Sequence, residues 1–314
     1  MRRTRVGHAA IGLAVALLVI GVYAQRAGAQ APGSAAQVEP QRQEPPTFIP
    51  QIRFNSGQSV VPYYEGWIKN ADGSFDIVFG YFNRNWQQEL AIPAGPDNKV
   101  EPFGPDAGQP TYFLPRRQRW IYRLRVPADF GNREVTWTIN ANGRTEKVVA
   151  SLIPAEEINE RVVASNGNFD TGVNDPNKAP ALTIPSSLTT TVGASLALTA
   201  TAADDGLPKP RAPREPRATP TTQGQPTFGG QINSSGGGRP RGLTVRWIEY
   251  RGPAKATFNA TDPMPATSGK AISTNVRFAA PGTYILRAIA NDGALSTVKD
   301  VTVTVSAAPS TDNR

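Results

Sequence analysis

Oxygen-bearing side chains of the type that binds a hard cation recur in the turns of the C-terminal half of the sequence. Asp204 and Asp205 follow one alternating apolar segment, Asp292 lies in a hairpin turn, and Asp175 and Asn177 precede this half. If this half folds as a β-sandwich, the loops after its second and sixth strands lie at the same end as the incoming linker. Calcium takes about six to eight oxygen ligands, so these residues predict a calcium site. The alternative is that Asp and Asn are present as turn formers.

Aromatic and arginine side chains are concentrated in the N-terminal half. Trp86 lies with Arg84 in an asparagine-rich polar turn, and Arg116 and Arg117 precede another predicted strand. Exposed rings stack on sugars and guanidinium groups hold anions, so these four residues predict a ligand-binding surface for a polysaccharide. The alternative is a buried core, because a sheet face with period-two aromatics is usually covered.

The reactive side chains of most hydrolases are missing. The sequence has no cysteine, and its one histidine, His8, lies in the N-terminal segment described next. A Ser-His-Asp triad, a cysteine nucleophile and an ordinary zinc site are therefore excluded from the exported chain. Glycosidase chemistry needs a carboxylate pair about 5–10 Å apart, and the acids of the N-terminal half define no such pair: Glu65, Asp72, Asp76, Asp97, Glu101 and Asp106. We predict that the protein is not an enzyme.

Residues 1–29 predict an export signal. Three arginines precede an uncharged apolar run, and Ala27-Gly28-Ala29 forms a small-x-small cleavage site. The alternative is an uncleaved anchor, which is the one membrane attachment that we expect. A cysteine-free exported chain indicates the envelope of a Gram-negative bacterium, in the periplasm, on the cell surface or outside the cell.

The net charge of +8 comes largely from two segments. The leader contributes four arginines and no acid, and the Pro/Gly-rich segment 207–241 contributes six basic residues and one acid. This composition predicts a disordered insert that is open to anionic partners. The remaining chain is close to neutral, so we expect no specific binding of nucleic acid.

Short alternating apolar segments separated by Gly, Pro and Asn predict an all-β protein. The segments 63–69, 74–82, 120–126, 135–139 and 144–152 predict an antiparallel sandwich, with Trp120 and Trp137 in its core. The segments 195–203, 243–250, 256–259, 271–278 and 278–305 predict a second, immunoglobulin-like sandwich. There we expect Trp247 in the core and Tyr284 pinning a corner through its hydroxyl. Residues 155–162 predict one or two helical turns.

Two family resemblances add to this pattern. Asp204-Asp205-Gly206, the strand with Trp247, Gly252-Pro253 and the run from Phe278 to Gly293 resemble polycystic-kidney-disease/cadherin-like modules. That resemblance implies extracellular adhesion, spacing or ligand presentation, without catalysis. In the first half, Gly80-Tyr81-Phe82-Asn83-Arg84-Asn85, the run from Gly108 to Arg117, and Trp137-Thr138-Ile139 resemble a family of uncharacterised exported bacterial proteins. This second resemblance implies where the first domain ends and that the protein is exported from a bacterium, and it implies no mechanism.

The predicted organisation is a signal peptide at 1–29, a disordered spacer at 30–51, a β-sandwich at 52–153, a linker at 154–180, an immunoglobulin-like domain at 181–306 and a tail at 307–314. We predict an exported, non-catalytic binding, adhesion or scaffolding module. Its expected partners are a polysaccharide or another envelope protein, and its oligomeric state is left open. The alternative function is a carboxylate-dependent carbohydrate-active enzyme or its accessory carbohydrate-binding subunit.

Overall fold

A computed structural model describes residues 53–167, 175–209 and 242–308 of the chain. Residues 52–314 form one compact unit, and its described part is almost entirely β. The helical segments there are a 3₁₀ turn at Pro154–Glu156 and the helix α1 at Glu160–Ala164. Both overlap the predicted helical stretch 155–162; the turn begins one residue before it and α1 ends two residues after it. Within the described ranges, none of the helices is long and apolar enough to cross a membrane.

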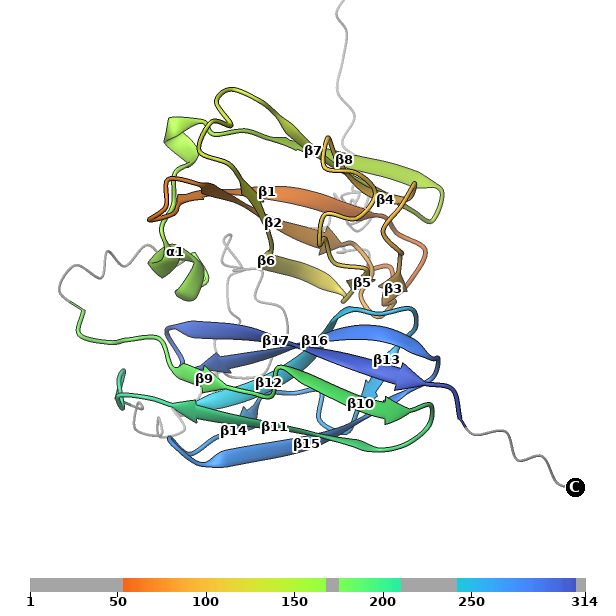
Figure 1. The fold of residues 1–314 in the computed structure, drawn as a ribbon, viewed down its shortest axis with the longest axis vertical. Helices are drawn as coiled ribbons and strands as arrows, with labels where there is room; N and C mark the ends of the chain where they lie inside the picture. Colours follow the sequence, from red (N-terminus) through yellow and green to blue (C-terminus); the bar gives the residue numbers. More distant parts are fainter. Residues whose placement is uncertain (1–52, 168–174, 210–241, 309–314) are drawn as a thin grey trace, which may run out of the picture. The chain divides into compact units, whose positions relative to one another are not determined.

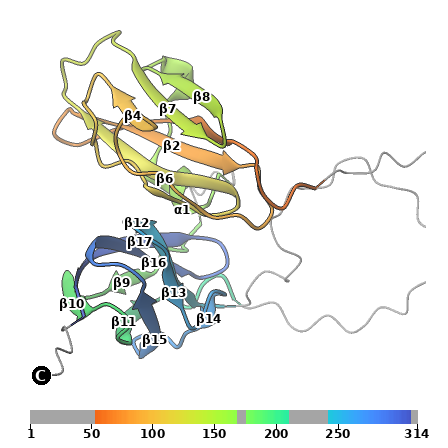
Figure 2. The same cartoon turned by 90° about the vertical axis from the view of Figure 1, so that its right-hand side faces the viewer.

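The first sandwich has two three-stranded antiparallel sheets (Figures 1 and 2). One sheet has the order β1 (Val60–Lys69), β2 (Phe75–Asn83), β6 (Arg116–Val126), and the other has the order β4 (Asn98–Glu101), β7 (Val135–Ala141), β8 (Arg144–Ala150). A short ladder joins β3 (Leu90–Ala91) to β5 (Tyr112–Phe113).

Aromatic side chains from both sheets fill this sandwich. Trp137 is fully buried, and its ring lies edge-on to Phe79 at 5.7 Å and to Tyr122 at 5.6 Å between ring centroids. Trp120 does not join them, so its predicted place in the core is wrong. Its φ of 56° lies where the pairing of β2 with β6 shifts register, and the side chain is half-buried. Because of this irregular backbone, Trp120 does not follow the alternation of buried and exposed side chains that its neighbours in β6 show.

The long Pro/Gly segment between Ile92 and Pro115 is held by two buried amides. Asn98 donates to the carbonyls of Ile92 at 3.0 Å and Pro110 at 2.8 Å, and it accepts from the indole of Trp137 at 3.0 Å. Gln109 donates to the carbonyl of Asn98 at 2.8 Å. Satisfied buried amides fix backbone position, so this segment has a defined shape despite its few strand residues.

The second sandwich has one five-stranded and one four-stranded sheet (Figures 1 and 2). The first has the order β10 (Ser187–Thr191), β17 (Ser296–Ser306), β16 (Gly282–Asn291), β12 (Thr244–Arg251), β14 (Met264–Pro265). The second has the order β13 (Ala256–Phe258), β15 (Ala271–Phe278), β11 (Leu196–Ala203), β9 (Ala181–Thr183). The described pairs are antiparallel except for β10 with β17, which is parallel.

The expected anchor residues of this sandwich lie as predicted. Trp247 is buried with 2% of its surface exposed, in a core that includes Leu198, Phe278 and Leu286. The hydroxyl of Tyr284 donates to the carbonyl of Ala280 at 2.9 Å, which ties the start of β16 to the preceding corner. The immunoglobulin-like fold is therefore visible in both the sheet order and the corner contact.

Tyr284→Phe tests the corner. The change leaves the ring packed against Phe278 but removes the hydroxyl that satisfies the Ala280 carbonyl. We expect the free energy of unfolding to fall by about 1–2 kcal/mol, the usual loss for one such bond. Urea unfolding followed by tryptophan fluorescence measures it. Tyr63→Phe is the matched control, because the Tyr63 ring is 40% exposed. An equal effect of both changes would contradict the corner role.

Strand β12 serves two cores. Val245 and Trp247 face the second sandwich, whereas Ile248 and Tyr250 are buried in the hydrophobic core of the first. The Tyr250 hydroxyl donates to the carbonyl of Gly108 at 2.7 Å, and the Tyr250 carbonyl accepts from the Thr111 amide at 3.2 Å. The long segment of the first sandwich therefore docks on the second.

Arg287 adds a buried charge to the same junction. Its guanidinium binds both carboxylate oxygens of Asp300, at 2.7 and 2.9 Å, and lies 4.0 Å from the centre of the Tyr250 ring. It also donates to the carbonyl of Ile121 in β6. The side chain thus links a strand of each sandwich.

Candidate functional site

The five predicted calcium ligands are only partly brought together. Asp175 is diverted, because it forms an ion pair with Arg161 in α1 and accepts from the Asn177 amide at 3.0 Å. Asp205 uses its oxygens for the amides of Lys178 and Leu207, at 3.0 and 2.9 Å. These two carboxylates therefore shape the loops, as turn chemistry predicts.

Asn177, Asp204 and Asp292 behave differently. Each has a buried side-chain oxygen without a hydrogen-bond partner among the described residues: Oδ1 of Asn177, Oδ1 of Asp204 and Oδ2 of Asp292. Asn177 and Asp292 are each only 3% exposed. Buried oxygens of this kind are costly unless something binds them.

The pKa of Asp204 is consistent with the loops of Asp204 and Asp292 lying close together. Burial raises the pKa of Asp204, and the neighbouring charges of Asp292 and Asp205 raise it further. The amide of Lys178 on Asp205 holds the linker against the same turn. Asp204 and Asp292 therefore lie close enough to repel each other, and the linker that carries Asn177 contacts the turn that contains Asp205.

A calcium ion fits the donor type here but not a full protein shell. Three side-chain oxygens are fewer than the roughly six to eight that calcium takes, so carbonyls and water would supply the rest. In the ranges that the structure describes, no group of three or more Asp, Glu, His or Cys side chains is arranged to hold a metal ion. The site depends on Asn177 as much as on the two carboxylates.

The predicted ligand-binding residues lie on a surface where arginine side chains rest on aromatic rings. The guanidinium carbon of Arg116 lies 4.2 Å from the ring centre of Trp86 and 4.8 Å from that of Phe82. Arg53 lies on the same indole at 4.3 Å. Arg84 is exposed in the turn next to Asn83, which pairs with Arg116. Three of the four predicted residues are therefore gathered here.

The fourth residue, Arg117, lies on a second ring nearby. Its guanidinium carbon is 3.8 Å from the ring centre of Tyr63, and it pairs with Glu65 at 2.6 Å. Arg119 approaches the same carboxylate at 3.6 Å and lies 4.6 Å from the Trp120 ring. Burial raises the pKa of Glu65, although both arginines act to lower it.

The arginine–aromatic surface, as we call it, consists of Arg53, Arg84, Trp86, Arg116, Arg117, Arg119, Tyr63 and Phe82. Sequence reasoning missed Arg53 as a member, because it lies at the very start of the predicted β-sandwich, before the first predicted strand. Arg119 was not among the four predicted residues, and Glu65 was considered only as one of the acids that define no catalytic pair. The sequence signal that could have found them is the Arg-Arg-Gln-Arg-Trp run beside the Tyr-Tyr-Glu of the first strand.

The backbone of this run is unusual. Arg116 has a φ of 66° and Trp120 a φ of 56°, a region that residues other than Gly, Asn and Asp seldom occupy. Both flank the stretch in which three arginines each rest on a ring. Such conformations persist where the surroundings enforce them, and they concentrate at binding and catalytic sites.

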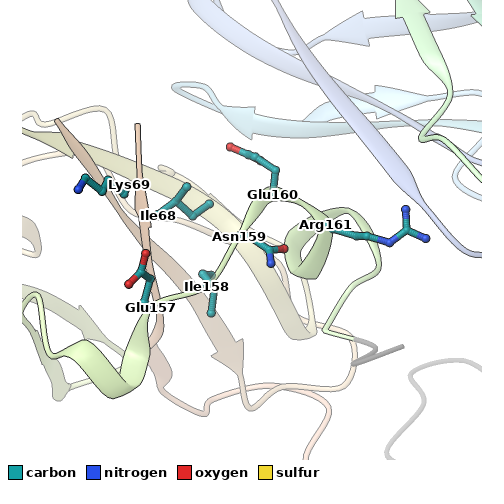
Figure 3. A pocket seen from close by; sticks show the side chains of 7 residues that line it. All are labelled: Ile68, Lys69, Glu157, Ile158, Asn159, Glu160 and Arg161. Atoms are coloured by element: carbon teal, nitrogen blue, oxygen red, sulfur yellow. The ribbon is translucent and has the colours of Figure 1, made fainter. Parts of the chain in front are cut away.

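A shallow depression of about 450 Å³ lies where the first sandwich meets the helical segment (Figure 3). It is lined by Ile68, Lys69, Glu157, Ile158, Asn159, Glu160 and Arg161. Glu160 binds Arg123 through both carboxylate oxygens, at 2.6 and 2.8 Å, and this pairing lowers the pKa of Glu160. Figure 3 shows the side chains of Glu157 and Glu160 pointing in different directions. A carboxylate held ionised by arginine is a poor general acid.

Most of the basic segment that we predicted to meet anionic partners, residues 210 to 241, lies outside the residues that the structure describes.

Comparison with known proteins yields similarity only to solved structures. A PKD domain of human KIAA0319 covers 46% of this chain and 96% of its own, at 14% identity and a TM-score of 0.22. The titin domains Z1Z2 in complex with telethonin cover 79% and 98%, at 9% identity and a TM-score of 0.24. Fibronectin(III)-like modules of Clostridium thermocellum CbhA cover 76% and 90%, at 12% identity and a TM-score of 0.23. At these TM-scores the similarities carry no inference about function.

No family model and no curated protein matches the chain. The resemblance of the first half to a family of exported bacterial proteins therefore finds no support. The structural neighbours named here are PKD, titin and fibronectin(III)-like domains at low identity.

Proposed function

We propose that this chain is an exported envelope protein of a Gram-negative bacterium that acts as a non-catalytic binding, adhesion or scaffolding module. The observation that carries the proposal is the buried junction of the two sandwiches, built on Ile248, Tyr250 and Arg287. A junction with buried apolar side chains and satisfied polar groups holds domains in a fixed relation, unlike a polar, loosely packed interface. A rigid body of this kind can present a binding surface or set a spacing.

Export is supported by the leader at residues 1–29 and by the absence of cysteine from the sequence. The periplasm, the cell surface and the exterior are all compatible with these features. The module would meet polysaccharide or other envelope proteins in each place.

Lack of catalysis is supported by the state of the carboxylates. Glu160 is paired with Arg123, and Glu65 is held between Arg117 and Arg119. Hydrolysis of a glycosidic bond needs one acid that donates a proton and a second that attacks or activates water. Glu160, held ionised by Arg123, is a poor proton donor, and Glu65, occupied by two arginines, is a poor nucleophile.

Cosedimentation with isolated envelope polysaccharide tests the function. The chain from Gln30 onward should pellet with the polymer, and the supernatant should show no new reducing ends. Release of reducing ends would favour the enzyme alternative. Failure to pellet with polysaccharide or with outer-membrane protein fractions would contradict the binding role.

We further propose that calcium binds at Asn177, Asp204 and Asp292. The support is the set of buried oxygens without partners, together with the repulsion that raises the pKa of Asp204. A bound cation would satisfy the oxygens and offset the repulsion between the carboxylates. With few protein ligands, the expected dissociation constant is about 10⁻⁴–10⁻³ M, typical of extracellular modules.

Thermal unfolding tests the calcium site. At 10 mM calcium we expect the midpoint to rise by roughly 3–8 °C relative to chelator, because a ligand of the folded state stabilises it. Asp292→Asn should remove most of the rise, since it lowers the ligand charge and keeps the side-chain acceptor of the hairpin. Asp129→Asn, at an exposed aspartate of the first sandwich, is the matched control. No rise in the unchanged chain would rule the site out.

A further inference from the structure

We propose that the arginine–aromatic surface binds an acidic polysaccharide through its carboxylate groups. The inference rests on the proposed binding function and gives it a ligand class. Its basis is an arrangement of guanidinium groups held against exposed rings, on a sheet face that the first sandwich leaves accessible at Tyr63 and Trp86.

The rings of this surface already carry cations. Arg53 and Arg116 both lie within 4.3 Å of the Trp86 ring centre, and Arg117 lies 3.8 Å from that of Tyr63. A neutral sugar that stacked on Trp86 would have to displace a guanidinium group. The rings therefore serve chiefly to orient the arginines. Arg117 and Arg119 donate to Glu65 and to the Asn166 carbonyl, whereas Arg53 and Arg116 form no ion pair in the described part of the chain. This arrangement favours an anionic ligand over a neutral one.

The positive charge of the surface is poorly compensated. In the part of the chain that the structure describes, no carboxylate forms an ion pair with Arg53, Arg84 or Arg116. Burial and repulsion by Arg53 hold the pKa of Arg116 below its usual range. Donors exceed acceptors here, and an incoming carboxylate supplies acceptors.

Glu65 shows how a carboxylate is bound on this surface. It accepts from Arg117 at 2.6 Å and lies close to Arg119, directly over Gly80, where a Cβ atom would lie 2.3 Å from its Oε1. The missing side chain at Gly80 makes room for this carboxylate. A uronate on a polymer presents the same group to the remaining arginines.

The polymer class follows from charge together with apolar surface. Phe54 is 51% exposed and its carbonyl accepts from the Trp86 amide at 2.9 Å, so one exposed ring lies beside the guanidinium groups in addition to the rings that they cover. Sugar rings present apolar faces between their carboxylates and match such a surface. Single-stranded nucleic acid binds by stacking bases on open rings, and here the rings carry arginine.

Polygalacturonate is the probe for the test, with neutral dextran and a single-stranded oligonucleotide as comparisons. We expect the chain from Gln30 onward to bind polygalacturonate in titration calorimetry, and to bind dextran and the oligonucleotide at least about tenfold more weakly. The double variant Arg53→Gln/Arg116→Gln should bind polygalacturonate about tenfold or more weakly than the unchanged chain. Equal binding by this variant, or equal affinity for dextran or for the oligonucleotide, overturns the proposal.

The matched control removes two exposed arginines elsewhere, at Arg144 in β8 and Arg277 in β15. Arg144→Gln/Arg277→Gln has the same net charge as the test variant and should bind polygalacturonate within about twofold of the unchanged chain. An equal loss in both double variants means that net charge alone drives binding, and the surface is then rejected. Thermal unfolding of each variant shows that it is folded.

A second variant acts in the opposite direction. Glu65→Gln removes the carboxylate that competes for Arg117 and Arg119, so affinity for polygalacturonate should rise about three- to fivefold. A folded Glu65→Gln chain with reduced affinity contradicts the proposal.

The outcome also separates this inference from the proposed function. If Arg53→Gln/Arg116→Gln still pellets with envelope polysaccharide as the unchanged chain does, the binding role stands and this surface is not its site. If the unchanged chain fails to pellet, the binding role itself fails.

Discussion

Arg287→Ala should lower the free energy of unfolding by about 2–3 kcal/mol, because it removes charged hydrogen bonds of a buried guanidinium whose partner Asp300 is 38% exposed. Arg287 is 9% exposed, and its guanidinium contacts Asp300, the Ile121 carbonyl and the Tyr250 ring. Its loss strands a buried carbonyl and opens the junction of the sandwiches. Calorimetry should then show two partly separated transitions where the unchanged chain shows one.

Two further variants define the effect. Arg287→Lys keeps the charge but not the planar fork, so it should recover less than half of the lost stability. Arg251→Ala breaks the pair with Asp106 at the rim of the same junction, where Asp106 is 54% exposed, and should cost at most about 1 kcal/mol. If Arg287→Ala and Arg251→Ala behaved alike, the buried pair would not hold the sandwiches together.

Glu249→Gln should stabilise the protein in alkaline solution by about 3–5 kcal/mol. Glu249 is 2% exposed, and burial raises its pKa to about 8 from its ordinary value of 4.5. Between these values the folded chain holds a proton that the unfolded chain has lost. Stability from this group is therefore complete below about pH 4.5, falls as pH rises, and is fully lost above about pH 8. Glutamine stays neutral throughout, so this decline disappears.

The geometry at Glu249 tolerates the change. Oε2 accepts from the Ala256 amide at 2.7 Å, which a glutamine oxygen can also do, and Oε1 lies beside Gly252 and the Tyr284 ring. Urea unfolding at pH 5, 7 and 9 should give similar stability for both chains at pH 5 and a widening difference above it. Glu134→Gln, at an exposed position, is the control and should follow the unchanged chain at every pH. Parallel curves for Glu249→Gln would mean that the buried acid is ionised over the whole range.

Local sequence signals predicted most of the strands because each depends on alternation and a turn. The second sandwich was the clearest case, since Tyr284 and Trp247 occupy the positions that their spacing indicates. The short strands β3, β4, β5 and β14 were missed, because two to four residues show no period. β9 and β10 were missed as well, in a stretch that we assigned to the second domain without placing strands.

The junction could not be predicted, because alternation along β12 looks the same whether its outer face meets water or another core. Nothing near Ile248 and Tyr250 signals that residues about 140 positions earlier cover them. The same limit applies to the sites. The sequence predicted Asp175 as a calcium ligand, but Asp175 forms an ion pair with Arg161, and the spacing of the two residues does not predict this contact. Trp120 left the core through a backbone irregularity that alternation cannot show.

The parallel pairing of β10 with β17 bears on how the second sandwich responds to tension. Ser187 pairs with Thr302 and Thr191 with Ser306, so the strand near the start of the sandwich and the strand at its end run in the same direction. A pull on the two ends first meets the three residues of β9, and then drags β10 and β17 past each other along their length. The ladder bonds are then loaded together in shear instead of opening one by one. The second sandwich therefore resists separation of its first and last long strands when its two ends are pulled apart.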